Sequence, residues 1–243
     1  MQTKENKMGV MPIDKLLISM SLPMMISMLV QALYNIVDSI FVSRINEYAL
    51  RAVSLAFPIQ SLMIAVAVGT AVGINAFLSK TLGEKDFEKA DIIAQNGIFL
   101  AIASYVAFAV IGLLVSRPFF ASQTEVLEVR EYGVTYLTIC CVAGMGIFLQ
   151  TTFERLLQAT GKTIYTMITQ STGAIINIIL DPIFILPKGY DMGLFNMPIG
   201  FDMGTKGAAI ATVIGQIVAC ILAIIINGKK NPDIQLALRK FRP

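Results

Sequence analysis

The stretch IIAQNGIFLAIASYVAFAVIGLLVS at residues 92–116 carries no charged side chain from one end to the other. A helix rises about 1.5 Å per residue, so a run of this length crosses the roughly 30 Å hydrocarbon core of a bilayer. Charge-free runs of similar character occur at residues 16–37, 52–79 and 132–153. The repetition predicts an all-α integral membrane protein.

The composition supports this class and excludes several others. Hydrophobic residues make up 56% of the chain, charged residues 14%, and the mean hydropathy is +0.72, whereas soluble chains carry about 25% charged residues. The three cysteines lie in apolar runs, which is not the pattern of a disulfide framework. Because the chain has no histidine, histidine-based triads and histidine metal sites are excluded. A disordered chain and a nucleic-acid-binding module are excluded too, and no nucleic-acid partner is expected.

Six transmembrane helices are expected, forming one lobe over residues 1–228. Their expected bounds are about residues 15–42, 53–79, 91–116, 131–153, 163–186 and 206–228. Residues 122–131 are expected to form a short external amphipathic helix. Residues 229–243 are expected to be a cytoplasmic linker, and its basic and apolar part is expected to lie on the membrane surface.

The basic residues set the expected orientation. With the N-terminus inside, thirteen of the 19 lysines and arginines face the cytoplasm. The remaining six are Arg44, Arg51, Arg117, Arg130, Lys188 and Lys206. Short loops rich in lysine and arginine stay on the cytoplasmic side. Both termini are therefore predicted to be cytoplasmic, in a multi-pass protein of the cell (inner) membrane that contacts membrane lipids.

Two aspartates, Asp38 and Asp181, interrupt the apolar runs. An ionisable residue inside a membrane helix costs about 2.5–3.5 kcal/mol on insertion scales, so such residues are functional candidates. Both helices are expected to run outward, which puts the two carboxylates at similar depth in the outer half of the membrane. Other polar residues share their helix faces at i, i+3 and i+4 spacings. These are Gln31, Tyr34 and Asn35 with Asp38, Gln170 and Asn177 with Asp181, and Thr212 with Gln216 in the last helix.

The simplest arrangement brings these three faces together around one hydrated pocket. Carboxylate, amide and hydroxyl oxygens are hard ligands that suit Na⁺, and two desolvated carboxylates close together are also suited to bind H⁺. The alternative is that the polar groups only hold helices together, which is the usual role of single Ser, Thr or Gln residues there. Gly69 and Gly73, in a GxxxG pattern, are expected to mark close helix packing.

Enzymatic catalysis is not expected from this sequence. The charged residues cluster in loops without a nucleophile–base pair, and no GxxxxGK[ST] loop for ATP phosphates occurs. No cofactor and no metal beyond a transported Na⁺ are predicted.

Short motifs in a fixed order extend over nearly the whole chain. Leu22-Pro23 and the pattern QxxYNxxDxxFV at residues 31–42 lie in the first helix, and LGE at 82–84 follows the second. QATGKT at 158–163 precedes the fifth helix, NxxxDP at 177–182 lies within it, and GAAIAT at 207–212 opens the sixth. In this order and spacing the chain resembles the multidrug and toxic compound extrusion (MATE) transporters, especially their bacterial drug/sodium antiporter branch.

The resemblance implies two six-helix bundles around a central cavity, of which this chain is similar to the first. It also implies a site for the coupling ion, Na⁺ or H⁺, in this lobe. The residues that match the site are Asp38, Asn177, Asp181 and Thr212. The neighbours expected to line the cavity around it are Gln31, Tyr34, Asn35, Tyr136 and Gln170. Pro23 is expected to be a hinge at which the first helix bends.

The implied function is secondary antiport, in which Na⁺ or H⁺ binds and a lipophilic, often cationic drug is exported. A second possibility is a truncated, non-transporting lobe, or a half-transporter that needs a second six-helix lobe or another copy of the chain. A third is a flippase for lipid-linked substrates. That reading is less favoured, because such cavities are lined by several arginines and the predicted spans hold no lysine or arginine between their ends.

Overall fold

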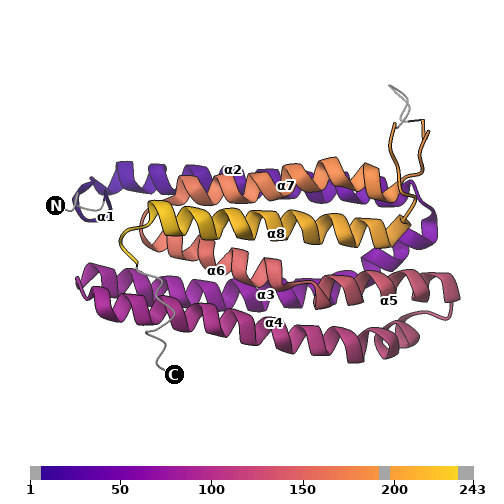
Figure 1. The fold of residues 1–243 in the computed structure, drawn as a ribbon, viewed down its shortest axis with the longest axis horizontal. Helices are drawn as coiled ribbons and strands as arrows, with labels where there is room; N and C mark the ends of the chain where they lie inside the picture. Colours follow the sequence, from indigo (N-terminus) through magenta and orange to yellow (C-terminus); the bar gives the residue numbers. More distant parts are fainter. Residues whose placement is uncertain (1–6, 192–197, 235–243) are drawn as a thin grey trace.

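The structure, a computed structural model, describes residues 7–191 and 198–234 and is built from α-helices (Figure 1). The helices are α1 Lys7–Val10, α2 Ile13–Ser43, α3 Glu47–Gly83, α4 Phe87–Gln123, α5 Leu127–Val142, α6 Met145–Ala159, α7 Thr163–Ile185 and α8 Gly204–Lys230. The one β-type contact among the described residues is an isolated bridge between Pro187 and Phe201. The predicted all-α membrane class is confirmed.

The long helices run side by side along the longest axis of the molecule (Figure 1). α7 packs extensively against α2 on one side and α8 on the other, whereas α2 makes only slight contact with α3 and α8. α8 packs in turn against α6 and α5, and α3 joins α4, α5 and α6 in the other half of the bundle. α2 is therefore attached to the rest of the molecule almost entirely through α7.

Within the described residues, five helices are each long and apolar enough to cross a membrane, namely α2, α3, α4, α7 and α8. α5 and α6 form a sixth span as a pair, with a bend of 44° between them. At the break, a Cβ atom on Gly144 would lie 2.6 Å from the Cys140 carbonyl oxygen, which leaves no space for a side chain. The helix predicted at residues 131–153 is thus a broken pair that extends further at both ends.

Tight turns replace several of the expected loops. Only residues 84–86 separate α3 from α4, and Asp86 caps α4 by accepting from the Lys89 amide at 3.1 Å. Asn46 caps α3 in the same way, accepting from the Ala49 amide at 2.7 Å. Each cap satisfies a backbone donor that the first helical turn leaves without a partner.

The external amphipathic helix predicted at residues 122–131 is wrong. α4 continues to Gln123 and α5 begins at Leu127, so the segment is divided between two membrane helices. The expected linker at 229–243 begins as the last turn of α8, and its residues 235–243 lie outside the described part of the chain.

The first and last long helices share one end of the bundle. α2 starts, and α8 ends, at the end where the α3–α4 and α6–α7 turns also lie, on the left of Figure 1. This arrangement agrees with an even number of crossings. The assignment of this end to the cytoplasm stays a prediction from the basic residues.

Pro23 lies inside α2, which continues as one helix on both sides of it. Proline has no N–H, so the carbonyl of Ser19, four residues earlier, loses its helical donor. The hydroxyl of Thr163, the first residue of α7, donates to this carbonyl at 3.4 Å. α2 is therefore weakened and tied to α7 at the same level, while the hinge itself stays a prediction.

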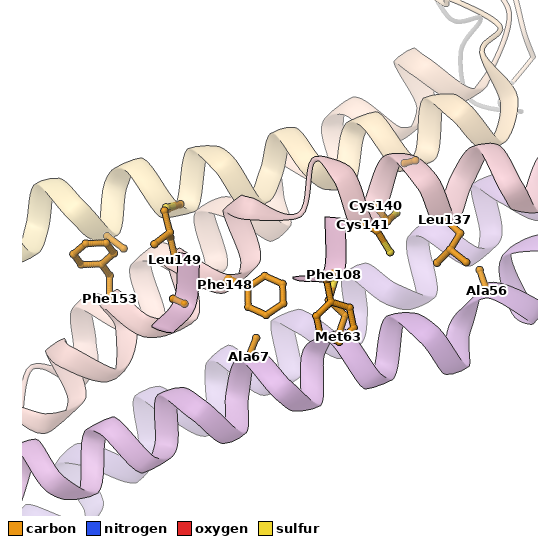
Figure 2. Close-up of a cluster of buried hydrophobic side chains, with 14 of the residues drawn as sticks. Ala56, Met63, Ala67, Phe108, Leu137, Cys140, Cys141, Phe148, Leu149 and Phe153 are labelled. Carbon is orange, nitrogen blue, oxygen red and sulfur yellow. The ribbon is translucent and has the colours of Figure 1, made fainter. Parts of the chain in front are cut away.

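The apolar core lies mainly among α3, α4, α5 and α6 (Figure 2). Met63 and Ala67 of α3 face Phe108 and Phe148, whose ring centroids are 5.7 Å apart. By contrast, only 11% of the apolar window of α2 is buried. α2 thus presents a long apolar surface to whatever surrounds the lobe.

Glycines bring α7 and α8 close together. A Cβ atom on Gly215 would lie 2.8 Å from the Gly173 carbonyl oxygen, and a Cβ on Gly173 would lie 3.0 Å from the Ala219 Cβ. Such small residues let two membrane helices approach at backbone distance. The close packing predicted for Gly69 and Gly73 is wrong, because no atom beyond the local helix lies within 4 Å of a Cβ at either position.

This difference gives a matched pair of variants. Gly215→Ala is expected to lower the free energy of unfolding by about 1–3 kcal/mol, because the added methyl group pushes α7 and α8 apart. Gly73→Ala adds the same group in open space and is expected to change it by less than about 0.5 kcal/mol. Thermal unfolding of the two purified variants in detergent measures the difference. Equal unfolding midpoints would contradict the close α7–α8 contact.

Candidate functional site

Asp181 is fully buried near the end of α7 and is the centre of a polar cluster. Asn177, one turn earlier on the same helix face, lies between Asp181 and Thr212 of α8. In the amide orientation that satisfies both ends, its nitrogen donates to Asp181 Oδ2 at 2.7 Å. Its oxygen then accepts from the Thr212 hydroxyl at 3.2 Å. Oδ1 of Asp181 is buried and accepts no hydrogen bond within the described chain.

Asp38 of α2 reaches the same region from the other side. Its Oδ1 is also buried and without a hydrogen-bond partner among the described residues. It is near enough to Asp181, Tyr34 and Tyr136 to interact with each of them electrostatically. Two carboxylates in low dielectric repel each other strongly when both are ionised. A cation bound between them, or a proton on one of them, removes that repulsion.

Tyr136 of α5 encloses the cluster from the opposite half of the bundle. Its side chain is 3% exposed, and its hydroxyl accepts a hydrogen bond from Nε2 of Gln60 on α3 at 3.3 Å. Gln60 is a residue that the sequence did not single out. A lone glutamine in an apolar run has no neighbour on its face to mark it, and only the packing of α3 on α5 reveals its partner.

Two predicted neighbours lie apart from the Asp38–Asp181 cluster. Asn35 is exposed on α2 rather than enclosed with Asp38. Gln170 lines a cavity, but it donates to Glu154 of α6 at 2.8 Å instead of approaching Asp181. Along α7, the eleven-residue separation from Gln170 to Asp181 corresponds to about 16 Å at helical rise.

Glu154 is a second buried carboxylate, with 3% of its surface exposed. Its Oε1 accepts from Gln150 Nε2 at 3.0 Å and from the Thr169 hydroxyl at 2.9 Å, and its Oε2 accepts from Gln170. Glu154 is not among the predicted site residues, because the predicted span ended at residue 153, where the charge-free run stops. The usable signal was the polar spacing Thr166, Thr169 and Gln170 at the start of α7, which repeats on one helix face.

Both clusters border one cavity of about 270 Å³. Gln150, Glu154 and Gln170 line its inner part, towards the start of α7. Tyr34, Asn177 and Thr212 line its outer part, and Gln31 lies on the α2 side. Apolar side chains from α2, α3 and α6 complete the wall, namely Met24, Met28, Ile64, Val68 and Ile147. The cavity thus joins an apolar surface to two separate carboxylate clusters.

One basic residue also lines this cavity. Arg155 donates through Nη1 to Gln158 Oε1 at 2.6 Å and does not pair with Glu154 within the described chain. Arg155 lies beyond the predicted span at 131–153, in the part of α6 that continues to Ala159. The flippase alternative stays less favoured, because a cavity for lipid-linked substrates is lined by several arginines and this cavity is lined by one.

The donor set around Asp38 and Asp181 fits a monovalent cation. It offers carboxylate oxygens without partners, the Asn177 amide oxygen and the Thr212 hydroxyl, all of them hard ligands. Na⁺ would draw on several of these oxygens at once, whereas H⁺ needs only one carboxylate. The arrangement is therefore chemically suited to either ion.

Comparison with known proteins gives a consistent result. A profile of the MatE family matches residues 23–183. The chain is 29% identical over 236 residues to the multidrug export protein MepA of Staphylococcus haemolyticus, covering 95% of this chain and 48% of that protein. MepA of Staphylococcus aureus (strain NCTC 8325) is 27% identical over 237 residues, covering 96% and 49%.

Solved structures extend the similarity to the fold. A MOP superfamily transporter from Pyrococcus furiosus superposes with a TM-score of 0.87 at 29% identity, covering 99% of this chain and 51% of that one. A MATE transporter in its straight conformation gives 0.86 at 30% identity, covering 99% and 51%, and one in its bent conformation gives 0.81 at 29%, covering 95% and 49%. The chain spans about half the length of these relatives.

The shared amide of Asn177 gives a test of the cluster. Asn177→Leu leaves a buried carboxylate oxygen and a hydroxyl without their partner, which is expected to cost about 1–3 kcal/mol of stability. Asn35→Leu makes the same chemical change at an exposed position of α2 and is expected to cost less than about 0.5 kcal/mol. Thermal unfolding in detergent compares the two. A larger loss for Asn35→Leu would mean that Asn35, not Asn177, is the structural member of the site.

Proposed function

Because the chain belongs to the MATE family of membrane transporters, we propose that it forms the ion-binding lobe of a secondary antiporter. The transporter exports lipophilic or cationic compounds, including drugs, in exchange for Na⁺ or H⁺. The observation that carries the proposal is the pair Asp38 and Asp181, whose buried Oδ1 atoms accept no hydrogen bond within the described chain. Neither forms an ion pair with lysine or arginine there.

Energetics explain why such a pair acts as an ion switch. A membrane protein gains nothing structural from two unpaired carboxylates side by side, since each is costly and they repel each other. When a cation or proton neutralises them, α2 and α7 pack more favourably. When the ion leaves, the repulsion returns and favours separation of the two helices. Ion binding thereby biases the lobe between two conformations, as a coupled transporter requires.

The way α2 is attached supports this mechanism. α2 packs mainly on α7, and Pro23 removes one backbone hydrogen bond at the level where Thr163 of α7 holds the Ser19 carbonyl. We propose that α2 bends at Pro23 when the Asp38–Asp181 pair is neutralised. Because Met24 and Met28 follow Pro23 within two helical turns and line the cavity, such a bend changes the space available to a substrate.

The cavity wall supports lipophilic substrates. Methionine is flexible and polarizable, so it adapts to ligands of different shape. The relatives from both Staphylococcus species are named multidrug export proteins, which agrees with a broad substrate range. No catalytic group is needed, because transport alone makes and breaks no covalent bond.

We further propose that a second six-helix lobe completes the transporter. Chains of this family that match here are about twice as long. The exposed apolar surface of α2 supports a partner or lipid on that side. The second lobe is supplied by the rest of a longer chain, by a separate partner or by another copy of this one. In each case this lobe lies in the cell membrane with both termini cytoplasmic.

Asp38→Asn is expected to abolish ion-coupled efflux, because the amide cannot bind H⁺ and is a much weaker ligand for Na⁺. The measurement is efflux of a fluorescent lipophilic cation from cells that produce the chain together with its second lobe. Asp14→Asn is the matched control, since it makes the same change at an exposed position in the first turn of α2. Ion-driven efflux that survives in Asp38→Asn at equal membrane abundance would refute the coupling role.

Pro23→Ala is expected to slow efflux several-fold while leaving ion binding intact. Alanine restores the N–H that can bond to the Ser19 carbonyl, so α2 becomes stiffer at this point. Pro58→Ala is the control, because Pro58 also lies inside a membrane helix but is exposed and away from the cavity. Ion binding is measured as the increase in unfolding temperature caused by added Na⁺ or by acidification. An unchanged efflux rate in Pro23→Ala would show that α2 does not bend there.

A further inference from the structure

The antiport mechanism uses the outer pair of aspartates and leaves the inner carboxylate, Glu154, without a role. A buried carboxylate in a membrane helix is costly to keep unless it does something. Glu154 is 3% exposed, yet it lines the cavity rather than the packed core. It therefore needs its own explanation.

Three neutral side chains hydrogen-bond the carboxylate of Glu154. Gln150, Thr169 and Gln170 each donate one hydrogen bond, at 3.0, 2.9 and 2.8 Å. Arg155 is adjacent in sequence, but its guanidinium binds Gln158 instead. Within the described chain the carboxylate is thus held in a fixed position and interacts electrostatically with Arg155, but it forms no salt bridge.

This donor arrangement differs from that of an alkali-metal site. A metal ion such as Na⁺ is bound by several converging oxygens. Around Glu154, the two glutamines present N–H groups and Thr169 presents its hydroxyl proton, so all three point hydrogens at the carboxylate. Such a group suits a bulky organic cation, which approaches one face of the carboxylate and does not need a full shell of oxygens.

The rest of the cavity suits the apolar part of the same molecule. Met24, Met28, Ile64 and Ile147 are among its lining residues. Polar side chains, among them Ser27, Thr151 and Arg155, also line it, so the cavity offers a small molecule both apolar contact and polar groups. Its volume of about 270 Å³ is close to the lower end of the range for small-molecule sites.

We propose that Glu154 is the anchor for the positively charged group of the transported substrate, a quaternary or protonated amine attached to an apolar body. The proposal rests on the antiport function and assigns the two ligands of that function to different carboxylates. The coupling ion binds at Asp38 and Asp181, while the organic cation binds at Glu154 at the inner end of the same cavity.

The test is a binding measurement on the purified chain in detergent, with no ion gradient. One probe is a dansyl fluorophore linked to a trimethylammonium group. The other is the same fluorophore linked to a tert-butyl group, which has the same shape and no charge. Glu154→Gln is expected to weaken binding of the ammonium probe about tenfold or more and to change binding of the tert-butyl probe less than about twofold.

Two further variants keep the test independent of folding. Glu154→Asp retains the charge and is expected to retain the preference for the ammonium probe, even if both affinities fall. Glu88→Gln makes the same substitution at an exposed position in the first turn of α4 and is expected to leave both affinities unchanged.

The coupling ion separates this proposal from the antiport mechanism. In Glu154→Gln, stabilisation of the protein by Na⁺ or acid is expected to persist, whereas Asp38→Asn loses it and still prefers the ammonium probe. In Glu154→Gln, an equal fall in affinity for both probes, or an unchanged affinity for the ammonium probe, would overturn the role of Glu154. Loss of ion stabilisation in Glu154→Gln would also overturn it, by assigning Glu154 to the ion. If Asp38→Asn keeps its stabilisation by Na⁺ or acid, the coupling site is refuted and the role of Glu154 is not affected.

Discussion

Polar groups in the hydrocarbon core of a membrane have no water to bind, so each must find its partner inside the protein. Helices solve this for most of the backbone, and the exceptions show where the chain is organised for movement. The carbonyl that Pro23 leaves free is bound by Thr163 across the α2–α7 contact. Buried carboxylate oxygens that remain without partners within the described chain occur at Asp38 and Asp181. Buried amide and guanidinium atoms of Gln95, Asn96 and Arg130 are also without a partner there, but the unpaired carboxylate oxygens lie at the proposed ion site.

α7 is the element on which these features converge. Its start holds α2 through Thr163 and Glu154 through Thr169, and its outer part carries Asn177 and Asp181. It is also fixed to α8 at the close approach of Gly215, so it cannot easily move relative to that helix. A fixed α7 with a loosely attached α2 on its other side makes α2 the part of the lobe most free to change position.

Much of this could be predicted from the sequence, because long charge-free runs have few alternatives to membrane helices. The matching polar faces around Asp38 and Asp181 could be predicted too, because polar residues stand out against these apolar runs. What the sequence hid depends on packing between distant segments. The bend at Gly144 was missed because glycine is common in membrane helices, and only the packing shows that the Cys140 carbonyl leaves no space for a side chain there. Glu154 was missed because ending a span at the first charge assumes that every charge lies outside the bilayer.

The distance between the two carboxylate clusters limits how they influence each other. They are separated by about 16 Å along α7, and two unit charges at that distance repel by about 1 kcal/mol at an effective dielectric constant near 20. A repulsion of this size weakens the binding of a second cation about fivefold, whichever of the two clusters is occupied first. Moving a two-state equilibrium from one extreme to the other takes about 5.5 kcal/mol. Direct repulsion between ion and substrate is therefore too weak to enforce exchange, and most of the coupling must come from a change in the shape of the cavity, for which the α2–α7 contact is the available element.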